Sequence, residues 1–400
     1  MAKPPSPARL SDAQRFDWLR LIRSENVGPR TFHALLKSCG GARAALEALP
    51  ALARRGGAAR PIRVAPAEEI ERELAVARKL GVRFVALGEP DYPPLLSHID
   101  SAPPLLALAG REAALRRPAV AVVGSRNASA AGLTFAHRLA RGLGEAGFVV
   151  VSGLARGIDQ RAHMATLETG AVGVLAGGHA KPYPLDAAPL IARMSESGAV
   201  VSEMPIDWEP RGRDFPRRNR IVSGLALGTV VVEAARGSGS LITARFALEQ
   251  NRQVFAVPGS PLDPRAEGAN ELLKQGATIC TRADDVVSAL EPSRSREPPL
   301  SLDEGGGARS LIDALPVATG AWPAAEFDPG GEAADPVEGA GGTRERIVAL
   351  LAPSPISLDD LARAADAPAR EVRVALIELE LAGRIEFSGD RVALRPGADG

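Results

Sequence analysis

The sequence predicts an α/β protein built around a Rossmann-like, doubly wound parallel sheet, with a helical N-terminal domain and a C-terminal winged helix. Residues 111–290 alternate short apolar runs with segments of helical periodicity, as expected for strands buried on both faces. Glycine and polar residues follow directly after these runs, where a doubly wound sheet binds its ligands. Three helical segments and a hairpin after residue 342 predict the winged helix.

The central strands are predicted from apolar runs rich in valine, and the helices from the amphipathic segments that follow them. Helices are expected at 130–147, 154–170 and 186–197. The expected strands are 119–125, 148–153, 171–178, 199–204, 228–234 and 253–259.

Residues 1–110 are predicted to form a mostly helical domain. Phe16, Leu19 and Ile22 mark one apolar stripe, and a second stripe follows at 32–36. The break "NVGPR" at 26–30 is typical of the turn in a helix–hairpin–helix unit. Such turns contact the DNA backbone in some proteins, but in a larger number of proteins they only connect two helices. Residues 82–96 predict a short strand with a proline-rich exit.

Residues 291–342 predict a flexible acidic linker, since they hold ten acidic and three basic side chains among many Pro, Gly and Ala residues. The chain is neutral overall, so the remainder of the chain is basic.

Residues 343–400 are predicted to form the winged helix. Its expected recognition helix mixes Arg370 and Arg373 with Glu371, Glu378 and Glu380, and a nearly neutral helix is poorly suited to duplex DNA. A protein contact is at least as good a hypothesis for this domain.

The composition excludes several classes of protein. No apolar run reaches the roughly 18 residues of a membrane span, and the N-terminus has no secretory h-region. Cys39 and Cys280 are too few for a disulfide framework or a four-ligand zinc site. We therefore expect a cytoplasmic protein that needs no cofactor.

Three strand-to-helix loops predict an anion site: "GSRNAS" (124–129), "SGLARGID" (152–159) and "ARGSGS" (235–240). Each provides glycine for close backbone approach and amides at a helix N-terminus. None is G-x-G-x-x-G after the first strand, and the chain has no G-x-x-x-x-G-K-[ST], which disfavours dinucleotide redox chemistry and ATP hydrolysis. The arginines of "FPRRNR" (215–220) are expected to form a basic rim beside these loops.

The acids and histidines give little support for catalysis. Glu203 and Glu233 end strands and form either a carboxylate pair or, as we favour, ion pairs and loop contacts that support the fold. The histidines, His33, His98, His137, His163 and His179, show no metal-binding spacing. For His163 a structural hydrogen bond with Asp159 is favoured over general-base catalysis, and His179 lacks an evident partner. The central lysines, Lys181 and Lys274, follow no P-loop.

The central region resembles the DNA-processing protein A family (DprA, also called Smf). The resemblance rests on "AVVGSRNAS", "VVSGLARGIDQRAH", "GGHAKPYP", "FPRRNRIVSGL", "VVVEAARGSGSLITARFALEQNRQVFAVPG" and "EGANELLKQGA". It implies a single-stranded DNA-binding domain, a homodimer, and loading of RecA recombinase onto incoming strands during natural transformation. With the loops and arginines above, it predicts DNA contacts at Gly124, Ser125, Arg126, Ser152, Gly153, Arg156, Gly157, Lys181, Phe215, Arg217, Arg218, Asn219, Arg220, Gly239, Ser240 and Thr243.

The chain departs from the family pattern at two places. Ala187 stands where an asparagine is usual after "YP", and Ala226 replaces the serine of "GLS".

A rival hypothesis is a nucleotide-processing enzyme of the Rossmann type, similar to nucleoside-monophosphate glycosidases, with Glu233 assisting. We predict no catalysis, because neither clustered carboxylates nor a P-loop lysine is present to hold a metal or a nucleotide.

Overall fold

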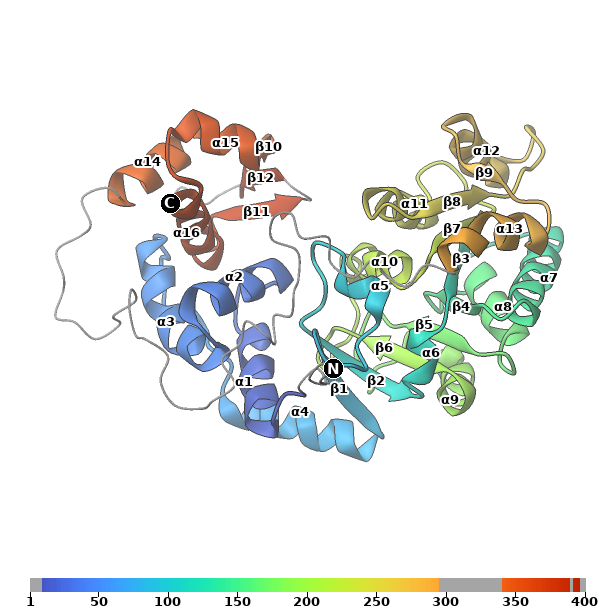
Figure 1. Ribbon diagram of the computed structural model, residues 1–400, viewed down its shortest axis with the longest axis horizontal. Helices are drawn as coiled ribbons and strands as arrows, with labels where there is room; N and C mark the ends of the chain where they lie inside the picture. Colours follow the sequence, from blue (N-terminus) through green and yellow to red (C-terminus); the bar gives the residue numbers. More distant parts are fainter. Residues whose placement is uncertain (1–8, 295–339, 389–390, 396–400) are drawn as a thin grey trace, which may run out of the picture. The chain divides into compact units, whose positions relative to one another are not determined.

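The computed structural model describes residues 9–294, 340–388 and 391–395. These residues divide into two compact units. The sheet unit holds residue 9 and the described residues from 71 to 294. The helical unit combines residues 10–70 with the described residues from 340 onward (Figure 1). Within the described part of the chain, no helix combines the length and apolar character required to cross a bilayer.

The sheet unit is built on a nine-stranded sheet with the order β1-β2-β6-β5-β4-β3-β7-β8-β9. The strands from β3 to β9 pair in parallel, while β2 pairs antiparallel with both β1 and β6. Their bounds are β1 Val82–Ala86, β2 Leu105–Gly110, β3 Ala119–Gly124, β4 Val149–Ser152, β5 Ala171–Val174, β6 Ala199–Ser202, β7 Gly228–Val232, β8 Gln253–Ala256 and β9 Thr278–Ile279.

Alternation along the buried strands divides the apolar core between the two faces of the sheet. In β3, Val120 and Val122 pack on one face, and Ala121 and Val123 pack on the other. The first face is covered by α7 (Ala130–Glu145), α8 (Ile158–Ala165), α9 (Ala188–Ser197) and α13 (Ala283–Arg294). The second is covered by α5 (Pro94–Ser97), α6 (Ala113–Arg116), α10 (Asp214–Gly224), α11 (Gly239–Glu249) and α12 (Glu267–Lys274).

The order of the strands creates a switch point beside β3. The chain proceeds from β3 through β4 and β5 to β6, and then returns to place β7 on the other side of β3. The connections after β3 and β7 therefore lead to helices on opposite faces, α7 and α11. A crevice opens between such diverging connections at the carboxyl ends of the strands.

The doubly wound parallel sheet predicted from the sequence is confirmed, with two corrections to the boundaries and elements. Residues 82–110, which we assigned to the helical N-terminal domain, contain β1 and the unpredicted strand β2, and both belong to the large sheet because their apolar residues complete its edge. The predicted linker is helical at both ends, where α13 reaches Arg294 and α14 begins at Ala340; its remainder lies outside the described residues. The predicted basic rim at 215–220 is part of helix α10.

The helical unit contains a helical bundle and a winged helix, as predicted. The bundle comprises α1 (Asp12–Arg23), α2 (Pro29–Cys39), α3 (Ala42–Arg55) and the start of α4 (Ala67–Lys79). A capping box between Ser11 and Gln14 begins α1, and Pro29 occupies the first turn of α2. The winged helix comprises α14 (Ala340–Leu350), β10 (Ile356–Ser357), α15 (Leu358–Ala365), α16 (Ala369–Leu381), β11 (Ile385–Ser388) and β12 (Arg391–Leu394).

Candidate functional site

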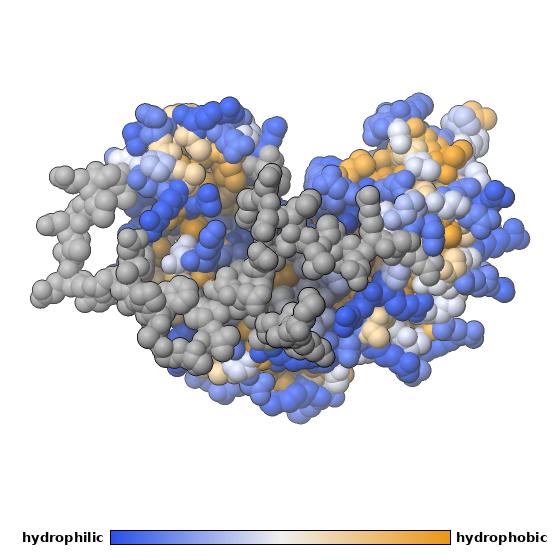
Figure 2. Space-filling model, viewed as in Figure 1, coloured by the Kyte–Doolittle hydropathy of each residue, from blue (hydrophilic) through white to orange (hydrophobic). Residues whose placement is uncertain are grey.

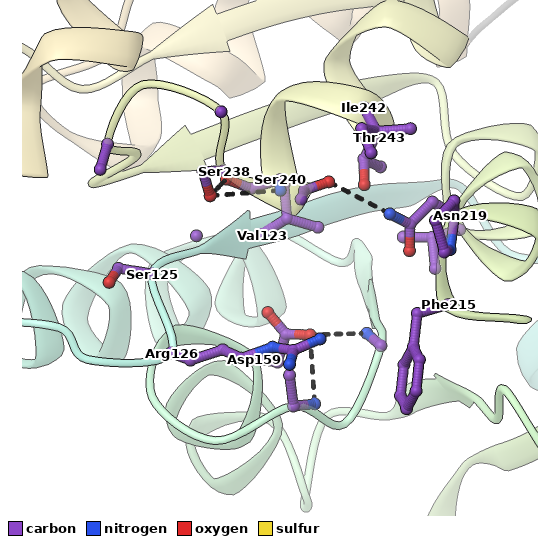
Figure 3. Close-up of a pocket in the computed structure, with 18 of the residues that line it drawn as sticks. Val123, Ser125, Arg126, Asp159, Phe215, Asn219, Ser238, Ser240, Ile242 and Thr243 are labelled. Atoms are coloured by element: carbon purple, nitrogen blue, oxygen red, sulfur yellow. Dashed lines mark hydrogen bonds between the residues drawn. The ribbon is translucent and has the colours of Figure 1, made fainter. Parts of the chain in front are cut away.

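A cavity of about 620 Å³ lies at the switch point of the sheet (Figure 3). Its walls are residues 123–127 at and after the end of β3, Gly153, Ala155 and Asp159 after β4, residues 235–240 after β7, and side chains of α10 and α11. The three loops predicted to hold an anion thus line one cavity. They meet because the carboxyl ends of parallel strands share one edge of the sheet.

The β3–α7 loop brings a cation and an aromatic ring together in this cavity. Arg126 is exposed, and its Cζ lies 5.4 Å from the ring centre of Phe215 on α10. Tyr183 meets the same ring edge-on at 5.4 Å. The Asn127 amide donates to Ser125 Oγ at 3.1 Å and shapes the turn. Gly124 has no room for a side chain, because a Cβ would overlap the carbonyl oxygen of Val232.

The N-terminus of α11 forms a second wall. Ser238 is its N-cap, and its Oγ accepts a hydrogen bond from the Ser240 amide at 3.4 Å. Asn219 Nδ2 donates to the Gly239 carbonyl oxygen at 3.2 Å, which ties α10 to this helix start. The N-terminus of an 11-residue helix carries partial positive charge and amides suited to an oxyanion.

The floor of the cavity contains a buried pair of opposite charges. The Asp159 carboxylate accepts hydrogen bonds from the amides of Gly153 (3.1 Å) and Ala155 (3.3 Å). Arg218 is 6% exposed and donates to the carbonyl oxygens of Gly153 and Val174. Burial raises the pKa of Asp159 and lowers the pKa of Arg218 to about 10, so the guanidinium remains charged at neutral pH.

Most of the predicted contact residues line this cavity, and the others lie around or beneath it. Ser152, Arg156, Gly157, Lys181, Arg217 and Arg220 are not part of the lining. The predicted residues that do line it are Gly124, Ser125, Arg126, Gly153, Phe215, Arg218, Asn219, Gly239, Ser240 and Thr243.

Helical periodicity separates the arginines of "FPRRNR". Phe215, Arg218 and Asn219 share the face of α10 that lines the cavity. Arg217 and Arg220 lie on another face, where both reach Glu203 at 3.1 Å and 2.5 Å. The Arg220 side chain is 8% exposed, so its charge is committed to an internal ion pair.

The remaining predicted residues outside the lining fall into supporting and exposed positions. Ser152 is buried, and its Oγ donates to the Val122 carbonyl oxygen at 2.6 Å. Gly157 has φ of 82° and precedes α8, and a Cβ there would overlap the carbonyl oxygen of Ser125. Arg156 and Lys181 are exposed, and Arg156 pairs with Asp186 at 3.3 Å.

The two strand-end glutamates support the fold, as predicted. Glu203 holds the two arginines named above. Glu233 accepts hydrogen bonds from the Ser129 amide at 2.9 Å and the Ser129 hydroxyl at 2.5 Å, at the N-cap of α7. Both carboxylate oxygens of Glu233 are thus engaged by Ser129.

The buried histidines are neutral. Burial lowers the pKa of His163 to about 3 and that of His179 to about 4. The predicted hydrogen bond between His163 and Asp159 is not formed, since the carboxylate accepts from the loop amides instead. Burial of the imidazole in the core between α8 and the sheet gives it a packing position rather than an acid–base role.

Four polar residues of the lining were not among the predicted contacts: Asn127, Asp159, Arg236 and Ser238. All four lie within the three predicted loops or at their ends, so the loops themselves were the signal. Arg236 is 90% exposed at its side chain and lies 3.6 Å from Glu267. Across the described residues, no cluster of three His, Cys, Asp or Glu side chains is arranged to hold a metal ion.

The arrangement is suited to binding an oxyanion. Three arginines and one hydrogen-bonded carboxylate line the cavity, so its net charge is positive. Backbone amides and hydroxyls of two loops face the same space. Among the lining residues the only carboxylate, Asp159, accepts hydrogen bonds from two loop amides.

Three family models match the chain in order. They are the DprA-like N-terminal HHH domain at residues 12–76, DNA recombination-mediator protein A at 83–291, and the DprA winged helix domain at 331–390. The second match begins at residue 83 and so includes β1 and β2, in agreement with the sheet. The central model is that of a mediator of DNA recombination.

Relatives and a solved structure agree with these models. DNA processing protein DprA from Bacillus subtilis is 39% identical over 57% of this chain and 77% of its own length. Protein Smf from Escherichia coli is 42% identical over 56% of this chain and 61% of its own length. The structure of DNA processing protein A from Streptococcus pneumoniae superposes with a TM-score of 0.58 at 31% identity, covering 70% of this chain and 98% of the other. The chain therefore belongs to the DprA/Smf family of DNA-processing proteins.

Proposed function

We propose that the switch-point cavity binds the phosphates of single-stranded DNA, and that the protein loads RecA recombinase onto incoming strands during natural transformation. In this proposal it acts in the cytoplasm as a homodimer. The DNA contacts are the residues predicted above, with the roles divided according to their burial.

The proximity of Arg126 and Phe215 is the observation that carries the proposal. An exposed guanidinium 5.4 Å from an aromatic ring offers a charge for a phosphate and a face for a base in one place. This pairing of cations with stacking rings is characteristic of proteins that bind single strands without reading sequence. Ser125, Ser240 and the α11 amides would complete the phosphate contacts.

Exposed cations outside the lining would extend the path of the strand. Arg156, Arg217 and Lys181 are exposed, and Lys181 lies two residues before Tyr183, which contacts Phe215. A mononucleotide would not reach these positions, whereas a polyanion would. Arg218, which is buried, would act through its positive charge from beneath the floor and by holding the 153–159 loop in place.

The rival function, a nucleoside-monophosphate glycosidase, would require Glu233 to act on the sugar. Its carboxylate is instead bound to Ser129 at the start of α7. Glu233 does not line the cavity. The geometry thus supports binding over catalysis.

Recombinase loading and dimerisation are supported by the name of the matched family and by an exposed apolar surface. Recombination mediation is what the matched central family is named for. Exposed apolar side chains lie toward the β9 edge of the sheet, and Figure 2 shows orange side chains near α11 and α12. The exposed apolar residues of this part of the chain are Leu248 on α11 (56% exposed), Leu262 between β8 and α12 (93%) and Ile279 on β9 (54%). Exposed apolar groups beside a short edge strand are a surface that a second copy would cover.

The test is a titration of oligo-dT at several salt concentrations with three proteins. Arg126→Ala removes the proposed phosphate contact. Arg141→Ala is the matched control, because this arginine on α7 is equally charged, exposed and paired only with Glu145 on the same helix. We expect Arg126→Ala to weaken binding by about 10-fold to 100-fold, the equivalent of a hydrogen bond to a charged group.

The salt dependence separates a phosphate contact from a general loss of charge. The slope of log K against log salt should flatten by about 0.7 in Arg126→Ala. Arg141→Ala should bind like the parent protein. Equal slopes for all three proteins would refute the phosphate assignment, and hydrolysis of a mononucleotide by the parent protein would favour the glycosidase.

A further inference from the structure

The helix–hairpin–helix turn of the bundle is in contact with the winged helix. Both belong to the helical unit. Asn26 Nδ2, in the turn between α1 and α2, donates to the Leu381 carbonyl oxygen at the end of α16, at 3.0 Å. Arg30, in the first turn of α2, lies with its Cζ 5.8 Å from the ring centre of Phe387 on β11. The turn that the sequence marks as a candidate DNA contact is thus engaged by the chain itself.

Two carboxylates of α16 accept hydrogen bonds from side chains of the bundle. Glu380 accepts a hydrogen bond from Thr31 Oγ1 in the first turn of α2. The Glu378 side chain is 8% exposed and accepts from Arg55 Nε, at the end of α3, at 2.7 Å. Arg344 of α14 lies 3.6 Å from its other oxygen. Hydroxyl and guanidinium groups that bind a carboxylate are also the groups that bind phosphate oxygens.

The close approach depends on a glycine. A Cβ added to Gly56 would overlap the Glu378 carbonyl oxygen and lie 3.0 Å from the Ala382 Cβ. The backbone at Gly56 is in the ordinary right-handed region, with φ of −69°, so alanine is compatible with its local conformation. Substitution there would disturb the contact with α16 without straining the end of α3.

We propose that the N-terminal bundle has a docking surface for the phosphate backbone of duplex DNA, formed by Asn26, Arg30, Thr31 and Arg55, and that the winged helix covers it. Glu378 and Glu380 occupy the places that backbone phosphates take after the winged helix moves away. The C-terminal domain is then a cover for this second DNA surface, separate from the cavity of the sheet unit.

The nearly neutral character of α16 fits this role. Glu378 and Glu380 contact donors of the bundle in the same chain, which accounts for their presence on this helix. Burial raises the pKa of Glu380, and the hydrogen bond from Thr31 opposes this shift. Competition between these side chains and DNA would make duplex binding conditional on release of the winged helix.

The experiment uses the full chain with Gly56→Ala as the releasing variant. Gly41→Ala is its matched control, because Gly41 precedes the other end of α3 and a Cβ there meets nothing within 4 Å. Hydrogen exchange of residues 26–36 and 376–384 reports the contact. A fluorescent duplex of about 20 base pairs reports the surface, and oligo-dT reports the cavity of the sheet unit.

Gly56→Ala should speed exchange in both segments and tighten duplex binding by about tenfold, the gain from exposing one charge-assisted contact. Adding Arg30→Ala should remove this gain, and affinity for oligo-dT should stay unchanged in all variants. Faster exchange without tighter duplex binding would overturn the proposal, because the uncovered surface would not bind DNA. Unchanged exchange would overturn it as well, because the winged helix would not be covering the turn.

Discussion

Gly153 offers a direct test of how the floor of the cavity is held. It follows β4, and a Cβ at this position would lie 2.6 Å from each of three guanidinium atoms of Arg218. Non-bonded heavy atoms prefer separations of about 3.5–4.0 Å, so Gly153→Ala requires the guanidinium to move by roughly 1 Å.

Arg218 cannot make this movement without loss. It is 6% exposed, donates to the carbonyl oxygens of Gly153 and Val174, and interacts with Asp159. Overpacking a tight site costs about 1–3 kcal/mol, and each hydrogen bond to a charged group contributes about 1.5–3 kcal/mol. We expect Gly153→Ala to lower the free energy of unfolding of the sheet unit by about 2–4 kcal/mol.

The assay is urea unfolding followed through hydrogen exchange of β4 and β5 amides, which measures the sheet unit separately from the helical unit. Gly239→Ala is the control, because a Cβ there meets nothing within 4 Å. It should leave the free energy of unfolding unchanged or raise it by up to about 1 kcal/mol. In an Arg218→Lys background the cost of Gly153→Ala should shrink. A cost below about 0.5 kcal/mol, or one that is equal in both backgrounds, would refute the reasoning.

Three further predictions follow from the structure. The pKa of His163 is lowered to about 3 in the folded protein, against 6.5 for an ordinary histidine, so the unfolded chain binds the proton and stability falls as pH drops below 6.5. At pH 5 this loss is about 2 kcal/mol, and denaturation of His163→Asn at pH 7.5 and 5 should show a correspondingly weaker pH dependence; an identical one would contradict the assignment. Glu233→Gln should destabilise the fold by about 1–3 kcal/mol, because it weakens the hydrogen bonds with Ser129, and it should leave oligo-dT affinity within a few fold. Enzymatic turnover by the parent protein that this variant abolishes would instead favour an enzyme. A chain ending after Arg294, which retains the whole of α13, should bind oligo-dT within a few fold of the full chain, and a complete loss of binding would place residues beyond 294 in the single-strand site.

The sequence by itself determined the parallel doubly wound architecture and predicted which loops line the cavity. Valine-rich runs buried on both faces, each followed by a helix, are specific to a parallel doubly wound sheet. Because the loops after parallel strands meet at one edge, three glycine-containing loops were sufficient to predict that they line one cavity. The supporting roles of Glu203 and Glu233 were also predicted, because each glutamate lies near hydrogen-bond donors, either in sequence or across the edge of the sheet.

Only the tertiary structure decided which charges face the cavity. "FPRRNR" carries its arginines on one α-helix, and a rotation of about 100° per residue directs Arg218 toward the floor and Arg217 and Arg220 toward Glu203. Residue type does not reveal this division, because burial and the position of a distant carboxylate decide it. The contact of α16 with the bundle is likewise a long-range event, formed between residues more than 300 positions apart, such as Asn26 and Leu381. Local patterns predict elements and their ends, whereas the partner of each charge depends on how those elements pack.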